Sequence, residues 1–307
     1  MKLEGIHHIT AITGDAPRNV EFYAGTLGLR LVKRSVNQDD PTVYHLFYAD
    51  EKGSAGSDIT FFEYPGARRG RAGAGMVHRI VWRVGSEYAL DFWDKRLKSE
   101  GVAVERDRLR LRFDDPEGLG LEIRVVDTTD EALIADHPQI PLEVALRGFD
   151  GVHAYSADPR TSEAFLRDTM GFAERSGSEW VARGERRRSF YVYDEMHEQG
   201  VSGAGTVHHV AWSSPMDEHD AWRERIALVQ PQVTPVIDRY YFKSIYFREP
   251  SGVLFEIATL GPGFAVDEPL ESLGENLALP PAYEPLRAEL EKVLTALPDP
   301  RSASLTR

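Results

Sequence analysis

The alternation of hydrophobic and polar residues along the chain predicts a short strand that recurs four times in similar form. Each copy is a β-branched or apolar run with polar residues interleaved, which is the pattern of a half-buried strand. The four runs are GIHHIT (5–10), MVHRIV (76–81), GVHAY (151–155) and TVHHVA (206–211). An internal repeat of this kind indicates that one structural unit is used several times.

A helix is predicted after each of these strands, and several further strands follow it. In the first copy Asp15 can cap the helix, Pro17 suits its first turn, and the helical pattern stops at Gly28. The corresponding helices of the other copies are expected at residues 87–97, 159–170 and 217–228. The repeated unit is therefore a βαβββ module, and the predicted fold class is α+β with four such modules.

The four modules are predicted to form two domains, because a polar stretch with two prolines (128–141) separates the second module from the third. The first domain is expected over residues 1–140 and the second over residues 146–265. A C-terminal extension (266–307) follows, with an amphipathic helix predicted from residue 284 to residue 297.

Composition narrows the chemistry that the chain can carry. The chain contains no cysteine, so any metal ion must be held by histidine, aspartate or glutamate. The formal net charge of −13 opposes nucleic-acid binding. No apolar run approaches the roughly 18 residues of a membrane span, and the N-terminus has no hydrophobic signal core, so we expect a cytoplasmic protein without membrane contact.

The histidine pairs of the first and fourth copies suggest a shared metal site. Neighbouring strand residues point to opposite faces, so one histidine of each pair is expected to face a given cavity. The first position is histidine in every copy (His7, His78, His153 and His208), whereas the second position is His8, Arg79, Ala154 and His209. A residue present in only two copies is what one shared site would show, so we assign His8 and His209 as ligands.

Glu256 is the third expected ligand. It lies between two large apolar residues near the end of an apolar strand, where an unpaired carboxylate would be costly to bury. Two histidines and one carboxylate form the facial triad of non-heme Fe(II) oxygenases. Glu63 ends a similar run and could be a fourth ligand, although a solvated or supporting role is favoured. His78, His153 and Glu122 are not expected to form a second site of this kind.

At this point the sequence resembles the vicinal oxygen chelate superfamily, which contains glyoxalases, bleomycin resistance proteins and extradiol dioxygenases. It is most similar to ring-cleaving dioxygenases of hydroquinones, such as 2,6-dichlorohydroquinone 1,2-dioxygenase. The resemblance covers nearly the whole chain, and its most specific motifs are TVHHVAW (206–212) and DRYYFKSIYFREPSGVLFEIAT (238–259). It implies two glyoxalase-like domains with curved mixed sheets.

The resemblance also implies the cofactor and the residues that act with it. One Fe(II) would be held at the positions of His8, His209 and Glu256, with Mn(II), Ni(II) or Zn(II) as alternatives. Catalytic roles are implied for His7, His208, Arg239 and Tyr246, whose types suit proton transfer and the stabilisation of a phenolate. The implied substrates are a small hydroquinone-type or catechol-type aromatic compound and O2, and the implied assembly is a homo-oligomer.

Two other functions stay open on the sequence. One is a glyoxalase-like lyase or isomerase that uses Glu63 as a fourth ligand and needs no O2. The other is a metal-free protein that sequesters a ligand, as bleomycin resistance proteins do, although the expected triad argues against it.

Overall fold

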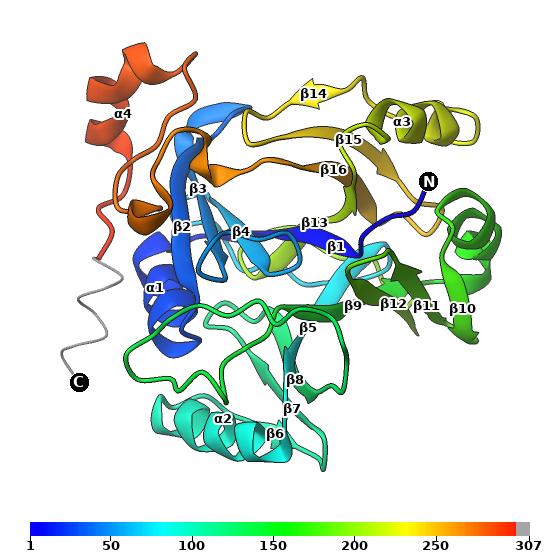
Figure 1. The fold of residues 1–307 in the computed structure, drawn as a ribbon, viewed down its shortest axis with the longest axis horizontal. Helices are drawn as coiled ribbons and strands as arrows, with labels where there is room; N and C mark the ends of the chain where they lie inside the picture. The colour runs from blue at the N-terminus through cyan, green and yellow to red at the C-terminus, as the bar shows by residue number, and fades with distance from the viewer. Residues whose placement is uncertain (299–307) are drawn as a thin grey trace.

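Two eight-stranded mixed sheets make up most of the computed structural model, which describes residues 1–298 (Figure 1). The first sheet curls at both ends, with β2 and β3 at one end and β14 and β15 at the other. Its strands, in spatial order, are β14 (Ile237–Asp238), β15 (Phe242–Arg248), β16 (Leu254–Pro262), β13 (Thr206–Ser214), β1 (Ile6–Thr13), β4 (Asp58–Glu63), β3 (Asp40–Ala49) and β2 (Arg30–Asn37).

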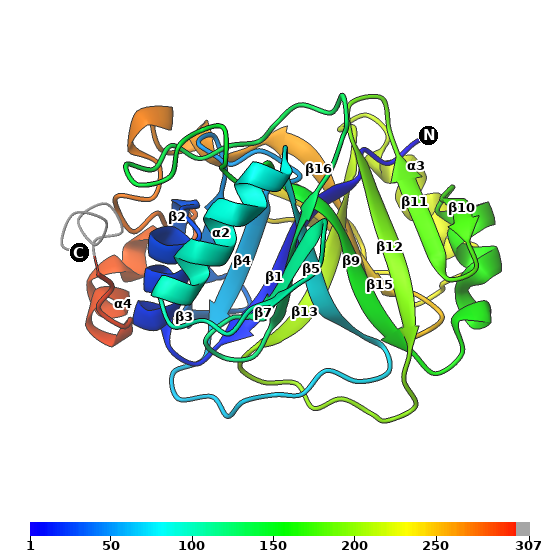
Figure 2. The same ribbon diagram turned by 90° about the horizontal axis from the view of Figure 1, so that it is seen from below.

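The second sheet repeats this arrangement and lies beside the first (Figure 2). Its strands, in spatial order, are β10 (Ala173–Ser176), β11 (Glu179–Arg183), β12 (Arg188–Glu195), β9 (Phe149–Ser156), β5 (Met76–Val84), β8 (Gly120–Val125), β7 (Arg110–Asp114) and β6 (Glu105–Arg106). The predicted α+β class with curved mixed sheets is confirmed.

Each sheet combines one module from the N-terminal half of the chain with one module from the C-terminal half. The first and fourth modules meet where β1 pairs antiparallel with β13, and the second and third meet where β5 pairs antiparallel with β9. Both sheets contain strands from either side of the predicted boundary between residues 140 and 146. The division into two domains stays a prediction, but the first sheet brings the two ends of the repeat together.

The predicted helices form, with local differences in their geometry. Asp15 accepts a hydrogen bond from the backbone of Arg18 at the start of α1 (Ala16–Val20), and Ser86 caps α2 (Glu87–Ser99) in the same way. The first helix continues as a wider π-helix, η1 (Glu21–Thr26), and the third module has a short 3₁₀ turn, η2 (Pro159–Ser162), before a π-helix, η3 (Phe165–Thr169). The fourth module contributes α3 (His219–Ala227).

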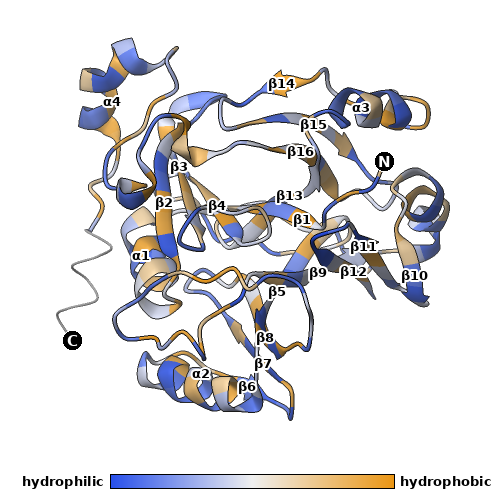
Figure 3. Ribbon diagram, in the orientation of Figure 1, coloured by the Kyte–Doolittle hydropathy of each residue, from blue (hydrophilic) through white to orange (hydrophobic). Residues whose placement is uncertain are grey.

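Large side chains fill the core between the sheets and the helices. All five tryptophans are fully buried, at positions 82, 93, 180, 212 and 222. In Figure 3 α2 shows bands of both hydrophilic and hydrophobic colour, as an amphipathic helix does. Its apolar residues Ala89, Leu90, Trp93 and Leu97 are buried. Each large apolar side chain buried in this way contributes roughly 1.5–3 kcal/mol to stability.

The C-terminal extension packs against β2 and the turn that follows it. After η4 (Phe264–Val266) and η5 (Leu270–Ser272), Leu279 and Leu290 form a small core with Val36. The expected helix is shorter than predicted, with η6 (Glu284–Leu286) leading into α4 (Arg287–Val293). Among residues 1–298, no helix is long and apolar enough to cross a membrane.

Candidate metal centre

His8, His209 and Glu256 meet inside the first sheet, as the sequence predicts. They lie on β1, β13 and β16, three neighbouring strands in the middle of the sheet (Figure 1). Nε2 of His8 is 3.3 Å from Nε2 of His209, and Oε2 of Glu256 is 3.2 Å and 2.9 Å from these two nitrogens. All three residues are buried. Three potential ligand atoms from distant parts of the chain therefore converge on one point.

The neighbouring histidines set the tautomers of the two imidazoles. Nε2 of His7 lies 3.1 Å from the carbonyl oxygen of Thr259 and donates to it, so Nδ1 of His7 accepts from Nδ1 of His8 at 2.9 Å. Nδ1 of His208 lies 2.7 Å from Nδ1 of His209, and the contact is satisfied when His209 donates. When His8 and His209 each carry the proton on Nδ1, their Nε2 atoms keep a free lone pair for a metal.

Burial and mutual attraction set the charges of the cluster. Burial favours the protonated form of Glu256, but its attraction to His8 and His209 outweighs this and holds its pKa well below the usual range. Burial lowers the pKa of His8, but attraction to Glu256 outweighs it and raises the pKa overall, whereas burial dominates for His209 and lowers its pKa. Burial, aided by His8, lowers the pKa of His7 to about 3, so His7 is neutral near pH 7.

The donor set fits a divalent cation. Oε1 of Glu256 accepts a 2.5 Å hydrogen bond from Oγ of Ser244, but Oε2 is buried and accepts no hydrogen bond from the described residues. A buried carboxylate oxygen without a partner is costly, and a cation that it shares with two imidazole nitrogens removes that cost. Two histidines and one carboxylate suit Fe(II), Mn(II), Ni(II) or Zn(II).

A cavity of about 500 Å³ opens beside these ligands. His8 and His209 line it, and so do several aromatic side chains: His45, Phe47, Phe62, Tyr64, His208, Tyr241, Phe242 and Tyr246. Planar walls of this kind suit an aromatic ligand. His7 is not part of the lining and lies behind His8, so its contacts orient the ligand rather than reach into the cavity.

Arg239 and Tyr246 stand together on the wall of the cavity. Nε of Arg239 lies 3.4 Å from the hydroxyl oxygen of Tyr246, and the Tyr246 ring is 5.7 Å from the His209 ring between centroids. The guanidinium also forms two hydrogen bonds to Asp39, at 3.1 Å and 3.0 Å. Burial opposes the charge on Arg239, but these contacts outweigh it and raise its pKa. Asp39 was not expected from the sequence.

His45 is a further residue of the cavity wall that the sequence argument missed. Its ring packs 3.9 Å from Phe47 and 4.4 Å from Phe62 between centroids, and its Nε2 is 2.8 Å from Oγ1 of Thr60. Burial lowers the pKa of His45 well below its usual range, with His8 adding to the shift. The period-two spacing of His45 and Phe47 on β3 was the available signal, since it places both on one face.

Glu63 is buried rather than solvated, and the structure does not bring it to the cluster. Its side chain is buried, and its Oε1 accepts hydrogen bonds from Oγ1 of Thr295 at 2.8 Å and from the backbone of Ala16 at 3.3 Å. Burial raises the pKa of Glu63. The C-terminal extension supplies Thr295, which no local pattern around Glu63 could indicate.

Strand register explains why Glu63 is not the counterpart of Glu256. On β13 the parallel partner of Glu256 is Ala211. The matching residue of β1, two positions after His8, is Thr10, and its parallel partner on β4 is Thr60. A threonine therefore occupies the fourth-ligand position, three residues before Glu63.

Register also corrects the alignment of the third copy. The pairing of β1 with β13 in the first sheet matches the pairing of β9 with β5 in the second. The first sheet pairs Ile6–Trp212, Ile9–Val210 and Thr10–His209, and the second pairs Phe149–Trp82, Val152–Ile80 and His153–Arg79. His153 thus matches Thr10 and not His7, so the sequence alignment of residues 151–155 was displaced by three positions. The error arose because a similar V–H pair recurs three residues further along β9.

The ligand positions of the second sheet hold no comparable site. Gly151 and Arg79 stand where His8 and His209 stand in the first sheet, and Glu122 pairs with Val81 as Glu256 pairs with Ala211. The carboxylate of Glu122 is instead bound by Arg112 at 2.9 Å and by Arg124 at 2.8 Å. These arginines satisfy the buried charge, so no metal is needed there.

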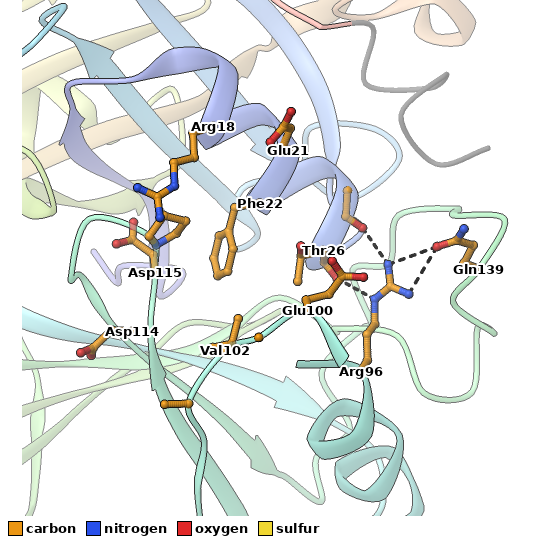
Figure 4. Close-up of a pocket in the computed structure, with 14 residues that line it drawn as sticks. Arg18, Glu21, Phe22, Thr26, Arg96, Glu100, Val102, Asp114, Asp115 and Gln139 are labelled. Atoms are coloured by element: carbon orange, nitrogen blue, oxygen red, sulfur yellow. Dashed lines mark hydrogen bonds between the residues drawn. The ribbon is translucent and has the colours of Figure 1, made fainter. Parts of the chain in front are cut away.

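A second cavity, of about 570 Å³, lies between the first helix and α2, away from the histidines. Figure 4 shows Arg96 reaching across it to the carbonyl oxygens of Gly25 and Thr26 and to Gln139. The carboxylates of Asp114 and Asp115 also line it, but none of its residues belongs to a group of three clustered metal ligands within residues 1–298. This cavity lies between the first and second modules and lacks the cluster of histidines and carboxylate found beside the first cavity.

Comparison with known proteins identifies the family of the chain. Residues 5–123 match the family described as Glyoxalase/Bleomycin resistance protein/Dioxygenase superfamily. MhqO of Bacillus subtilis (strain 168), which its name assigns provisionally to the ring-cleaving dioxygenases, is 44% identical over 95% of this chain and 96% of its own length. The chlorohydroquinone/hydroquinone 1,2-dioxygenase of Sphingobium indicum is 34% identical over 95% of this chain and 96% of its own length.

Solved structures show the same architecture. A protein from Bacillus subtilis, described provisionally as a dioxygenase, superposes with a TM-score of 0.89 at 41% identity and covers 97% of this chain and 98% of its own. Glyoxalase I from Zea mays shares the fold alone, with a TM-score of 0.60 at 14% identity over 83% of this chain and 92% of its own. The chain belongs to the glyoxalase/bleomycin resistance protein/dioxygenase superfamily, among relatives named as ring-cleaving dioxygenases.

Proposed function

We propose that this chain is an Fe(II)-dependent dioxygenase that opens the ring of a hydroquinone-type aromatic compound with O2. The observation that carries the proposal is the convergence of two imidazole lone pairs and one unpartnered carboxylate oxygen beside an aromatic-lined cavity. His8, His209 and Glu256 would hold the ion. Fe(II) at this place would supply redox chemistry that activates O2 beside a bound substrate.

The residues around the cavity suit the handling of a phenol. Arg239 presents a fixed cation that stabilises a phenolate oxygen, and the hydroxyl of Tyr246 beside it can donate a hydrogen bond to the same oxygen. His208 lines the cavity and is neutral near pH 7, because desolvation and the neighbouring His209 lower its pKa to about 4. With its Nδ1 accepting from His209, this neutral imidazole carries its proton on Nε2 and can donate a hydrogen bond to a substrate oxygen.

The remaining groups orient these side chains and exclude water. His7 forms hydrogen bonds with Thr259 and His8, and these fix the orientation of the imidazole ring of the proposed metal ligand His8. Phe47, Phe62 and Phe242 give the cavity an apolar wall that keeps water from the reacting groups. The name of the Sphingobium relative, a chlorohydroquinone/hydroquinone 1,2-dioxygenase, favours hydroquinones over catechols as substrates. The expected homo-oligomer and cytoplasmic location stay predictions.

The test is reconstitution of the metal-free chain with Fe(II) under anaerobic conditions, followed by O2 uptake with a panel of hydroquinones and catechols. We expect uptake with at least one hydroquinone, and its loss in Glu256→Gln. The matched control is Glu122→Gln, which removes the equivalent buried carboxylate of the second sheet and should retain uptake. An iron-loaded chain that consumes no O2 with any of these compounds would remove the proposal.

The same assay separates the proposal from a glyoxalase-like reaction. A lyase or isomerase needs no O2, and the fourth carboxylate that it was expected to use is bound by Thr295 and Ala16 instead. Conversion of a substrate at equal rates with and without O2 would favour that reaction. Binding of an aromatic compound by the metal-free chain, without any turnover after loading, would favour a sequestering protein.

A further inference from the structure

A second group of metal-type side chains lies on the other sheet, apart from the proposed active site. It consists of His78 on β5, His153 on β9 and Asp194 on β12, and these three strands are neighbours (Figure 2). Nε2 of His78 lies 2.8 Å and Nδ1 of His153 lies 3.0 Å from the same carboxylate oxygen, Oδ2 of Asp194. Within residues 1–298, only this group and the first trio gather three such ligands.

The group is not a copy of the first trio. Strand pairing matches His153 on β9 with Thr10 on β1. Asp194 pairs with Tyr155 on β9 in the same way as Phe62 pairs with Ile12 on β1, so Asp194 matches Phe62. His78, which precedes Arg79, matches His208. Thr10 lies beside the first trio, while Phe62 and His208 line the cavity next to it. The second group therefore occupies the place that the substrate cavity has in the first sheet.

The geometry of the group suits a cation. Two ligands of a tetrahedral ion, at about 2.1 Å from it, lie about 3.4 Å from each other, so the two nitrogen–oxygen distances of 2.8 Å and 3.0 Å need to widen by only about half an ångström to admit Zn2+. The corresponding distances in the first trio are 3.2 Å and 2.9 Å. The ring of His78 stacks on Tyr155 at 3.7 Å and 9°, which fixes its orientation.

The charges of the group are those that a metal requires. Each histidine can present a lone pair to a shared ion when its proton lies on the ring nitrogen that faces away from Asp194. Hydrogen bonds from His153 and His78 hold the pKa of Asp194 far below its usual range, so its carboxylate is ionised. The side chain of Asp194 is 44% exposed, which leaves the remaining coordination positions to water.

We propose that His78, His153 and Asp194 bind a second divalent cation of borderline softness, such as Zn2+, at a site separate from the proposed catalytic ion. Two imidazole nitrogens and one carboxylate are ligands that Zn2+ accepts, with water completing its shell. The ion binds more weakly than at the first trio, because Asp194 is partly exposed and the guanidinium of the adjacent Arg79 repels a cation.

The test measures the number of Zn2+ ions per chain after equilibrium dialysis of the metal-free, full-length protein, using elemental mass spectrometry. We expect two ions in the wild type, one in Asp194→Asn and one in Glu256→Gln. The control is Asp217→Asn, which changes an exposed aspartate in a turn and should leave two ions. Thermal unfolding of each variant shows whether it is folded, and His153→Gln replaces Asp194→Asn if that variant is not.

The variants separate this proposal from the proposed function. One ion in the wild type that is lost in Asp194→Asn but kept in Glu256→Gln supports the second site and removes the first. The second site is overturned if the wild type binds one ion that is lost in Glu256→Gln but kept in Asp194→Asn. It is also overturned if Asp194→Asn binds as many ions as the control Asp217→Asn. In either of these last cases the two histidines serve only as hydrogen-bond donors to Asp194.

Discussion

Ser244→Ala is predicted to weaken metal binding at the first trio, although Ser244 is not itself a ligand. Its hydroxyl donates a 2.5 Å hydrogen bond to Oε1 of Glu256, and both residues are fully buried. The bond holds the carboxylate so that the other oxygen, Oε2, faces His8 and His209. Without it Oε1 loses its donor and the carboxylate is free to turn.

The size of the effect follows from the kind of hydrogen bond. A hydrogen bond to a charged group is worth roughly 1.5–3 kcal/mol, and about 1.4 kcal/mol corresponds to a tenfold change in affinity. We therefore expect metal affinity to fall by about 10- to 100-fold, which is also the usual range for residues that orient a metal ligand.

The assay is a competition titration of the metal-free protein with Zn2+ and a chromophoric chelator. The matched control is Ser213→Ala on β13, because the hydroxyl of Ser213 is equally buried but has no hydrogen-bond partner among residues 1–298. The reasoning is refuted if Ser244→Ala changes the affinity of the tight site less than twofold, or if both serine variants weaken it equally.

Three other predictions concern charge. Asp39→Asn removes the charge of the exposed carboxylate that binds Arg239, and we expect KM for a hydroquinone to change by roughly two- to fivefold with little change in kcat, measured by O2 uptake. Burial lowers the pKa of His8, but attraction to Glu256 outweighs it and raises the pKa overall, so protons compete with the metal for His8 and metal affinity, measured by dialysis, should fall as the solution is made more acidic. Burial raises the pKa of Asp58 to about 8, so the folded chain binds a proton there that the unfolded chain releases near pH 4. The free energy of unfolding of metal-free protein should therefore fall between about pH 4 and pH 8, and denaturant titrations of Asp58→Asn should show a flatter decline.

Most of the fold could be predicted from the internal repeat, because each module begins with a strand whose pattern of apolar and polar residues is visible locally. Symmetry between the first and fourth copies selected His8 and His209, the apolar neighbours of Glu256 selected the third residue, and the structure brings all three together. The third copy could not be aligned from sequence, since its V–H pair falls three residues later on the strand and only the pairing of β5 with β9 reveals this.

Contacts between distant segments account for the other differences. Glu63 was expected at a solvated sheet end, but Thr295 of the C-terminal extension binds it. Asp39 reaches Arg239 only because the β2–β3 turn folds over the fourth module, where Gln38 also donates to the carbonyl oxygen of Arg239 at 2.7 Å. Such partners are about 200 residues or more apart in the chain, so no local pattern of residues indicates them.

The most direct measurement is anomalous X-ray diffraction at the iron edge from crystals of the Fe(II)-loaded chain. The account predicts a strong peak within about 2.3 Å of Nε2 of His8, Nε2 of His209 and one carboxylate oxygen of Glu256. Iron bound elsewhere, or these three side chains contacting one another with no peak between them in a chain that consumes O2, would contradict it.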